Sequence, residues 1–156
     1  MKYDLFGLGN ALVDHEFHTT DALLDELAIE KGLTTLIEPD RADVVLSTMT
    51  ERQGPASKAA GGSGANSVVA AAAMGSRTYY AAQLADDENG HFYVKDMQAA
   101  GVETNADQHM KPGVTGRCFV MVTPDAERTM NTSLGVTGDL ALDSLDPEVI
   151  ASSRAI

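Results

Sequence analysis

Two polar residues near the start of the chain have side chains suited to binding a small molecule that carries several hydroxyl groups. Asn10 and Asp14 follow a short apolar run that ends in Gly7-Leu8-Gly9. A carboxylate accepts hydrogen bonds from hydroxyls, and an amide both donates and accepts them. The run is typical of a buried strand, and open α/β sheets bind ligands beyond the carboxyl ends of their strands. An Asx turn beside a solvated acid explains the same spacing without a ligand.

A glycine-rich turn at residues 60–66 is the second candidate for contact with a ligand. It reads Ala-Gly-Gly-Ser-Gly-Ala-Asn and leads into an alanine-rich stretch that ends at Gly75. The pattern predicts a helix that begins at Ser63 and is capped by Gly75. Unpaired N–H groups and the positive end of the helix dipole would favour a polar or anionic group at the turn. A tight strand-to-helix turn without a ligand fits the same residues.

Better-known ligand motifs do not match these glycines. Ala65 stands where a nucleophile elbow needs its second glycine, and the turn lacks the lysine of a phosphate-binding P-loop. Ser67 takes the place of the third glycine of a dinucleotide fingerprint. Gly7 and Gly9 fail the same fingerprint, because Leu12 occupies its third glycine position. Nicotinamide and flavin cofactors are therefore not expected.

No metal site is expected from the histidines or from the acidic segments. His15 and His18 are separated by two residues, and the residues around them favour a strand. Side chains three positions apart in a strand point to opposite faces, so the two imidazoles would not share a metal ion. The acidic turn at residues 86–90 lacks the spacing of a calcium-binding EF-hand loop and predicts the N-terminal cap of a helix instead.

Composition limits the class of protein. The 156 residues are 44% hydrophobic, which is enough for one domain with a proper core. A formal net charge of −12 disfavours binding to nucleic acid or to an anionic membrane. Cys118 is the single cysteine, which precludes an internal disulfide and favours a reducing compartment. With no secretory signal and no apolar run of membrane-spanning length, a soluble cytoplasmic protein is expected.

Apolar periodicity predicts alternating strands and helices. The predicted strands cover residues 3–9, 33–37, 77–84 and 102–107, and the predicted helices cover residues 21–31, 40–50, 91–100 and 147–151 in addition to the one that starts at Ser63. Two β-like runs at 114–122 and 128–133 predict an antiparallel hairpin, and a new strand is expected to begin at 154–156. This order predicts an α/β fold, a doubly wound sheet with an added hairpin.

These features together resemble the N-terminal half of the PfkB carbohydrate kinases, the ribokinase and adenosine kinase group. The similarity rests on Asn-Ala-Leu-Val-Asp at 10–14, Gly-Gly-Ser-Gly-Ala-Asn at 61–66, Asp-x-x-Gly at 87–90, Ala-Gly-Val at 100–102 and the late hairpin. The resemblance implies a ribokinase-like fold, a three-layer α/β domain with a doubly wound sheet and a small β lid, incomplete at its C-terminus. Residues 1–156 would form the N-terminal, substrate-binding part of that domain.

The resemblance also implies which residues bind the substrate. Asp14, Gly61, Gly62 and Asn66 match family positions that hold the hydroxyls of a sugar or of a ribose, and Asn10 would line the same pocket. The ligand is therefore expected to be a small-molecule sugar or nucleoside. The spacing Asn-x-x-x-Asp looks more like the adenosine kinase branch than the ribokinase branch.

The lid implied by the resemblance consists of two segments. These segments lie near residues 14–37 and 111–133, and the expected lid contacts are Thr35, Leu36 and Cys118. A homodimer could form through this lid or through an exposed edge of the sheet.

The catalytic machinery of the family is not found in these residues. The resemblance implies ATP and Mg²⁺ as cofactors, and transfer of the γ-phosphoryl group to a primary hydroxyl. The family's Gly-Ala-Gly-Asp and Asn-x-x-Glu motifs, which hold the catalytic base, the anion hole and the magnesium and nucleotide contacts, do not occur here. No catalytic residue is therefore assigned. Arg128 is similar to a family arginine near the transferred phosphate, although pairing with the neighbouring Asp125 and Glu127 explains it equally well.

The leading expectation is thus the acceptor-binding half of an ATP-dependent sugar or nucleoside kinase, truncated before the catalytic aspartate and inactive by itself. The alternative is a noncatalytic module that binds a sugar, a nucleoside or another protein.

Overall fold

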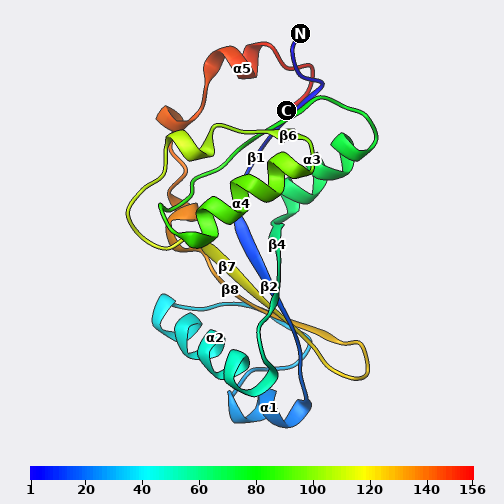
Figure 1. Ribbon diagram of the computed structural model, residues 1–156, viewed down its shortest axis with the longest axis vertical. Helices are drawn as coiled ribbons and strands as arrows, with labels where there is room; N and C mark the ends of the chain where they lie inside the picture. Colours follow the sequence, from blue (N-terminus) through cyan, green and yellow to red (C-terminus); the bar gives the residue numbers. More distant parts are fainter. The chain divides into compact units, whose positions relative to one another are not determined.

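Figure 1 shows the computed structural model, which describes the backbone of residues 1–156 and every side chain except that of Asp143. The chain divides into two units. The first unit consists of Met1–Val13, Ala60–Gly116 and Gly135–Ile156, and the second consists of Asp14–Ala59 and Arg117–Leu134. Strands β2 (Leu12–His18) and β4 (Ser57–Gly61) run from one unit into the other.

The first unit is built on three parallel strands in the order β1-β5-β6. Its strands and α-helices are, in chain order, β1 (Leu5–Leu8), α3 (Ser63–Ala73), β5 (Thr78–Ala81), α4 (Glu88–Ala99), β6 (Val102–Glu103) and α5 (Pro147–Ala151). Three 3₁₀ turns complete it, η1 (Ala106–Gln108), η2 (Gly135–Asp139) and η3 (Leu142–Ser144). Parallel strands need a crossover connection, which α4 supplies between β5 and β6.

Helices cover both faces of this three-stranded sheet. Adjacent residues of β5 point to opposite faces, and accordingly Tyr80 belongs to one apolar cluster and Tyr79 to another. The Tyr80 cluster includes Val68 from α3 and Met97 from α4. The Tyr79 cluster is packed against α5, for example by Val149. The first unit therefore has three layers, in the order helix, sheet, helix.

The second unit contains a sheet of five strands in the order β3-β8-β7-β2-β4. Its remaining elements are α1 (Asp21–Glu26), β3 (Thr34–Leu36), α2 (Pro39–Gln53), β7 (Gly116–Val122) and β8 (Arg128–Ser133). β7 and β8 form an antiparallel hairpin in which Val122 is paired with Arg128, and β3 runs parallel to β8.

One face of this sheet packs against α1 and α2. Phe17 from β2 and Phe119 and Met121 from β7 form a buried cluster with Leu24 of α1 and Val45 of α2. Because side chains alternate along a strand, the residues between them point to the opposite face of the sheet.

Several predicted elements are confirmed. The helix after the glycine turn begins at Ser63, and it ends with Gly75 in the left-handed region at a φ of 92°. The predicted hairpin is present, and the helix at Pro147–Ala151 has the predicted bounds. None of the described helices has the length and apolarity that crossing a bilayer requires.

Three expectations about elements are wrong. The helix predicted for residues 21–31 ends at Glu26, because Ala28 adopts a φ of 50° and the N–H of Ile29 bonds back to the Leu24 carbonyl. Residues 57–61 form β4, a strand that is missing from the predicted set. Residues 154–156 do not form a strand; the nearest pairing is an isolated bridge between Tyr3 and Ser153.

Replacing Asp87 should strongly destabilise the first unit. Its carboxylate caps α4 through the Gly90 N–H at 2.7 Å and accepts bonds from the Thr115 N–H at 2.9 Å and the Thr115 hydroxyl at 2.7 Å. Thr115 is fully buried, so Asp87→Ala leaves its N–H and its hydroxyl proton without the acceptor that they bond. We expect a loss of about 2 to 4 kcal/mol in the free energy of unfolding, measured in urea.

Asp86→Ala is the matched control for this measurement. The Asp86 carboxylate is exposed, and the described ion pair that it makes is with His91 at the surface, so its removal should change stability by less than about 1 kcal/mol. Equal losses in the two variants would contradict the role given to Asp87.

Candidate functional site

The glycine turn and the end of β1 meet through their backbones. β4 ends at Gly61, and Gly62 is the N-cap of α3 with a φ of 100°. A Cβ added at Gly62 would lie 2.5 Å from the carbonyl oxygen of Asn10, closer than side chains approach. Only glycine therefore fits at position 62, and the contact brings Asn10 to the turn in the first unit.

The N-terminus of α3 is open to solvent. No side chain caps it, and its first intrahelical bond runs from the Asn66 N–H to the Gly62 carbonyl at 2.9 Å. The side chains of Asn10 and Asn66 are both exposed. The N–H groups of the first turn carry partial positive charge, so this end of the first unit offers donors and two amides to a hydroxylated ligand.

Helix α4 supports the turn through two contacts. The Tyr93 hydroxyl donates to the Gly61 carbonyl at 3.3 Å, and the Asp96 carboxylate accepts from the Ala60 N–H at 2.8 Å. Sequence reasoning did not identify Tyr93 or Asp96. Each bond spans more than thirty residues of chain, so no local pattern signals it.

Asp14 lies beyond the end of β1, as the sequence suggested, and it belongs to strand β2 of the second unit. The chain leaves β1 at Leu8 and re-enters a strand at Leu12, which makes the intervening loop only three residues long. Asp14 is partly buried, and this burial raises the pKa of its carboxyl above the ordinary value. The charge of Arg128 lowers this pKa, and that of Glu16 raises it.

The predicted lid contacts fall on two different faces of the second sheet. The register aligns Leu36 of β3 with Thr132 of β8, and Thr132 with Cys118 of β7. These three residues therefore share one face. Thr35 is aligned with Asn131 instead and points to the face that α1 and α2 cover. A ligand that contacts Leu36 and Cys118 on one face of the sheet would therefore not contact Thr35, which points to the other face.

Cys118 has the chemistry of a buried structural thiol. Burial raises its pKa, while a hydrogen bond with Thr132 and the charge of Arg128 lower it. The charge of Asp14 also raises the pKa of this thiol. Asp14, Cys118 and Arg128 therefore lie close enough in the second unit to interact electrostatically.

Arg128 is exposed, and another cation neutralises the acid beside it. Lys31 bonds Asp125 in the hairpin turn at 2.7 Å and Asp21 of α1 at the same distance. Asp125 is therefore engaged with Lys31, and the charge of Arg128 acts on Asp14. Of the two roles that the sequence left open, this arrangement favours an arginine that is available to an anion.

The histidines behave as the strand pattern predicts. In β2, His15 is buried beside the ring of Phe119 at 5.7 Å, whereas His18 is exposed on the other face. Within the described side chains, no group of three or more His, Cys, Asp or Glu residues is placed to hold a metal ion.

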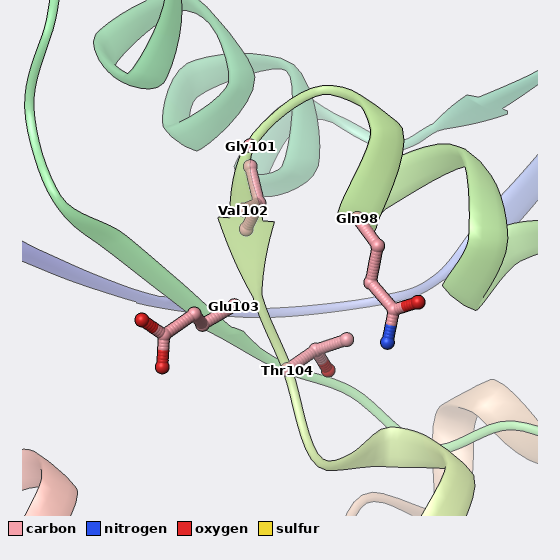
Figure 2. Close-up of a pocket in the computed structure, with 5 residues that line it drawn as sticks. All are labelled: Gln98, Gly101, Val102, Glu103 and Thr104. Carbon is pink, nitrogen blue, oxygen red and sulfur yellow. The ribbon is translucent and has the colours of Figure 1, made fainter.

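A shallow pocket in the first unit lies away from the predicted residues. Figure 2 shows its lining, which comes from α4, from β6 and from the residues beside β6, and has a volume of about 290 Å³: Gln98, Gly101, Val102, Glu103 and Thr104. The carboxylate of Glu103 accepts hydrogen bonds from Tyr3 and Lys2. None of the residues predicted to bind substrate lines this pocket.

The protein family and the two solved structures described next are kinases of sugars or nucleosides. Residues 32–154 match the sequence profile of the pfkB family carbohydrate kinases. The adenosine kinase from Sinorhizobium meliloti is 37% identical and superposes with a TM-score of 0.84 over 99% of this chain and 46% of its own. A probable sugar kinase from Rhizobium etli CFN 42 is 32% identical, with a TM-score of 0.86 over 98% of this chain and 45% of its own.

Curated relatives include fructokinases. The fructokinase from Solanum tuberosum is 29% identical over 99 residues, which cover 62% of this chain and 31% of the relative. The chain therefore spans less than half the length of the relatives and structures that it matches.

Replacing Asp14 by asparagine should stabilise the protein at neutral pH. Since the folded-state pKa is raised, the stability associated with this group is complete below the unfolded pKa of about 4 and is lost as pH rises through the folded pKa. Asp14→Asn removes that loss, and we expect a rise in Tm of about 1 to 4 °C at pH 7. The difference from wild type should shrink below about pH 4.

Glu16→Gln is the comparison, because Glu16 is exposed two residues along the same strand; its charge is only a minor cause of the raised Asp14 pKa, so its removal should raise Tm by less than Asp14→Asn does. A fall in Tm at pH 7 for Asp14→Asn would show that the carboxylate is a stabilising structural acid.

Proposed function

We propose that this chain, which belongs to the pfkB family of carbohydrate kinases, binds the phosphate acceptor of a sugar or nucleoside kinase. Its fold is ribokinase-like α/β. The observation that carries the proposal is the glycine turn, whose backbone contacts that of Asn10. No side chain caps the N-terminus of α3 at this turn. This arrangement offers N–H donors and amides, the groups that recognise hydroxyls.

Five residues would bind the acceptor. Asn10, Gly61, Gly62 and Asn66 would supply backbone and amide groups, and Asp14 would supply a carboxylate. The half-buried carboxylate suits a diol, because an ionised acid accepts two hydroxyl protons and its desolvation strengthens both bonds. Hydrogen bonds from a bound acceptor would offset the desolvation of the Asp14 carboxylate, which lowers stability in the absence of a ligand.

Most of the proposed lid belongs to the second unit, and residues 111–116 belong to the first. Segments 14–37 and 111–133 would close over the acceptor, with Leu36 and Cys118 on the face toward it. Arg128 lies on the same face as these two residues and would interact with the transferred phosphoryl group through its charge. Apolar contact from Leu36, which is 69% exposed, would then be gained only on binding.

The phosphoryl donor would be ATP with Mg²⁺, as the family implies. The described residues form no cluster for a metal ion, and neither the Gly-Ala-Gly-Asp nor the Asn-x-x-Glu motif occurs in the 156 residues. The roles proposed for this chain are therefore limited to binding and orienting the acceptor, and to charge near the transferred group.

A nucleoside such as adenosine is the preferred acceptor. This preference is supported by the Asn-x-x-x-Asp spacing and by the 37% identity to an adenosine kinase, compared with 29% to a fructokinase. A noncatalytic binding module has less support, because these comparisons lead to kinases.

Binding of adenosine, ribose and fructose to the purified protein, measured by calorimetry, tests the proposal. Asp14→Ala should weaken binding of the preferred acceptor by about 10- to 100-fold, since loss of charged hydrogen bonds costs about 1.5 to 3 kcal/mol. Glu16→Ala is the matched control on the same face of β2 and should bind like wild type. If Asp14→Ala retained full affinity for every acceptor, the assignment of Asp14 would be wrong.

A further inference from the structure

Tyr80 presents a buried hydroxyl to the first turn of α3. Its side chain rises from the middle strand β5 toward α3 and is only 1% exposed. Burial raises the pKa of Tyr80 to about 12, so the phenol stays protonated and neutral at physiological pH. The Tyr93 side chain and the Ala65 backbone lie near the hydroxyl and lower its pKa, although neither makes a hydrogen bond of good geometry with the oxygen.

Two glycines make room for this hydroxyl. A Cβ added at Gly9 would lie 3.0 Å from the Tyr80 oxygen and within 4 Å of no other atom outside its immediate neighbours. A Cβ added at Gly64 would lie 3.1 Å from the same oxygen, 3.2 Å from the Tyr80 Cε2 and 3.3 Å from the Leu8 carbonyl. The phenol oxygen is thus wedged between the end of β1 and the first turn of α3.

Both segments that touch the hydroxyl carry residues of the proposed acceptor site. Gly9 immediately precedes Asn10, and Gly64 lies two residues before Asn66. A phenylalanine ring would fill the apolar space below them equally well but would place no atom between them. The contribution specific to tyrosine is therefore the spacing that its oxygen imposes between the two segments.

We propose that Tyr80 is a positioning residue of the acceptor site, whose hydroxyl oxygen sets the separation between Asn10 and Asn66. This inference rests on the proposed function, because it assumes that the two asparagines bind an acceptor. Tyr80 acts through the backbone of Gly9 and Gly64 and does not contact the ligand itself.

A double-mutant cycle between positions 9 and 80 tests the wedge. Gly9→Ala should weaken acceptor binding by about 3- to 10-fold, because the new methyl group pushes against the hydroxyl and displaces Asn10. In the Tyr80→Phe background the only close contact is gone, so adding Gly9→Ala should change affinity by less than about 1.5-fold. Affinity for adenosine and fructose is measured by calorimetry.

Gly64→Ala serves as the matched control in both backgrounds. Its Cβ would also press on the Tyr80 ring and on the Leu8 carbonyl, so removal of the hydroxyl should not rescue it. Thermal unfolding of all variants separates positioning from general damage, because a purely structural effect would lower Tm without the rescue of affinity at position 9.

The outcomes distinguish this inference from the proposed function. If wild type binds an acceptor and Gly9→Ala binds equally well, or if Tyr80→Phe fails to rescue Gly9→Ala, the role of Tyr80 is refuted and the site stands. If wild type binds none of the sugars and nucleosides, the proposed function fails, and the positioning role fails with it. Rescue at position 9 without rescue at position 64 supports the proposal.

Discussion

The close approach of the Gly62 backbone to the carbonyl oxygen of Asn10 is the contact on which the arrangement of the first unit depends. A Cβ at position 62 would lie 2.5 Å from that oxygen, so the chain can pass there only without a side chain. This passage directs the first turn of α3 over the end of β1. Alanines in α3 then allow the helix to lie close to β1 and β5, and Tyr80 fills the space beneath.

The second unit has charged side chains on one face of its sheet. Its sheet has one face packed against α1 and α2, and the other face holds Asp14, Cys118 and Arg128. In a chain with a net charge of −12, the distribution of cations matters. Lys31 is engaged by two carboxylates and the buried Arg117 by Asp43, whereas the charge of Arg128 falls on Asp14. On this face, Arg128 and Asp14 therefore interact with each other through their charges.

Local signals in the sequence predicted much of this structure, and long-range contacts account for most of what they missed. The glycine turn, the start of α3 and the hairpin are encoded by neighbouring residues, so their prediction succeeded. β4 has the sequence Ser-Lys-Ala-Ala-Gly, with little intrinsic strand preference, and it forms because it pairs at the edge of the five-stranded sheet. The face of Thr35 depended on register with β8, which no local pattern specifies. The contacts of Tyr93 and Tyr80 were missed for the same reason.

The early end of α1 has a consequence for the mutability of the protein. Ala28 holds a left-handed conformation that a residue with a Cβ adopts at a cost of about 1 kcal/mol, and Ile29 closes the motif by bonding back to Leu24. Glycine would adopt this conformation without that cost, but it would also enlarge the conformational freedom of the unfolded chain. Exchange of Ala28 for asparagine or glycine should therefore change stability little, whereas a β-branched residue should lower it, because such residues rarely adopt a positive φ. The segment that leads to Lys31 can thus tolerate variation at its bend and keep its direction.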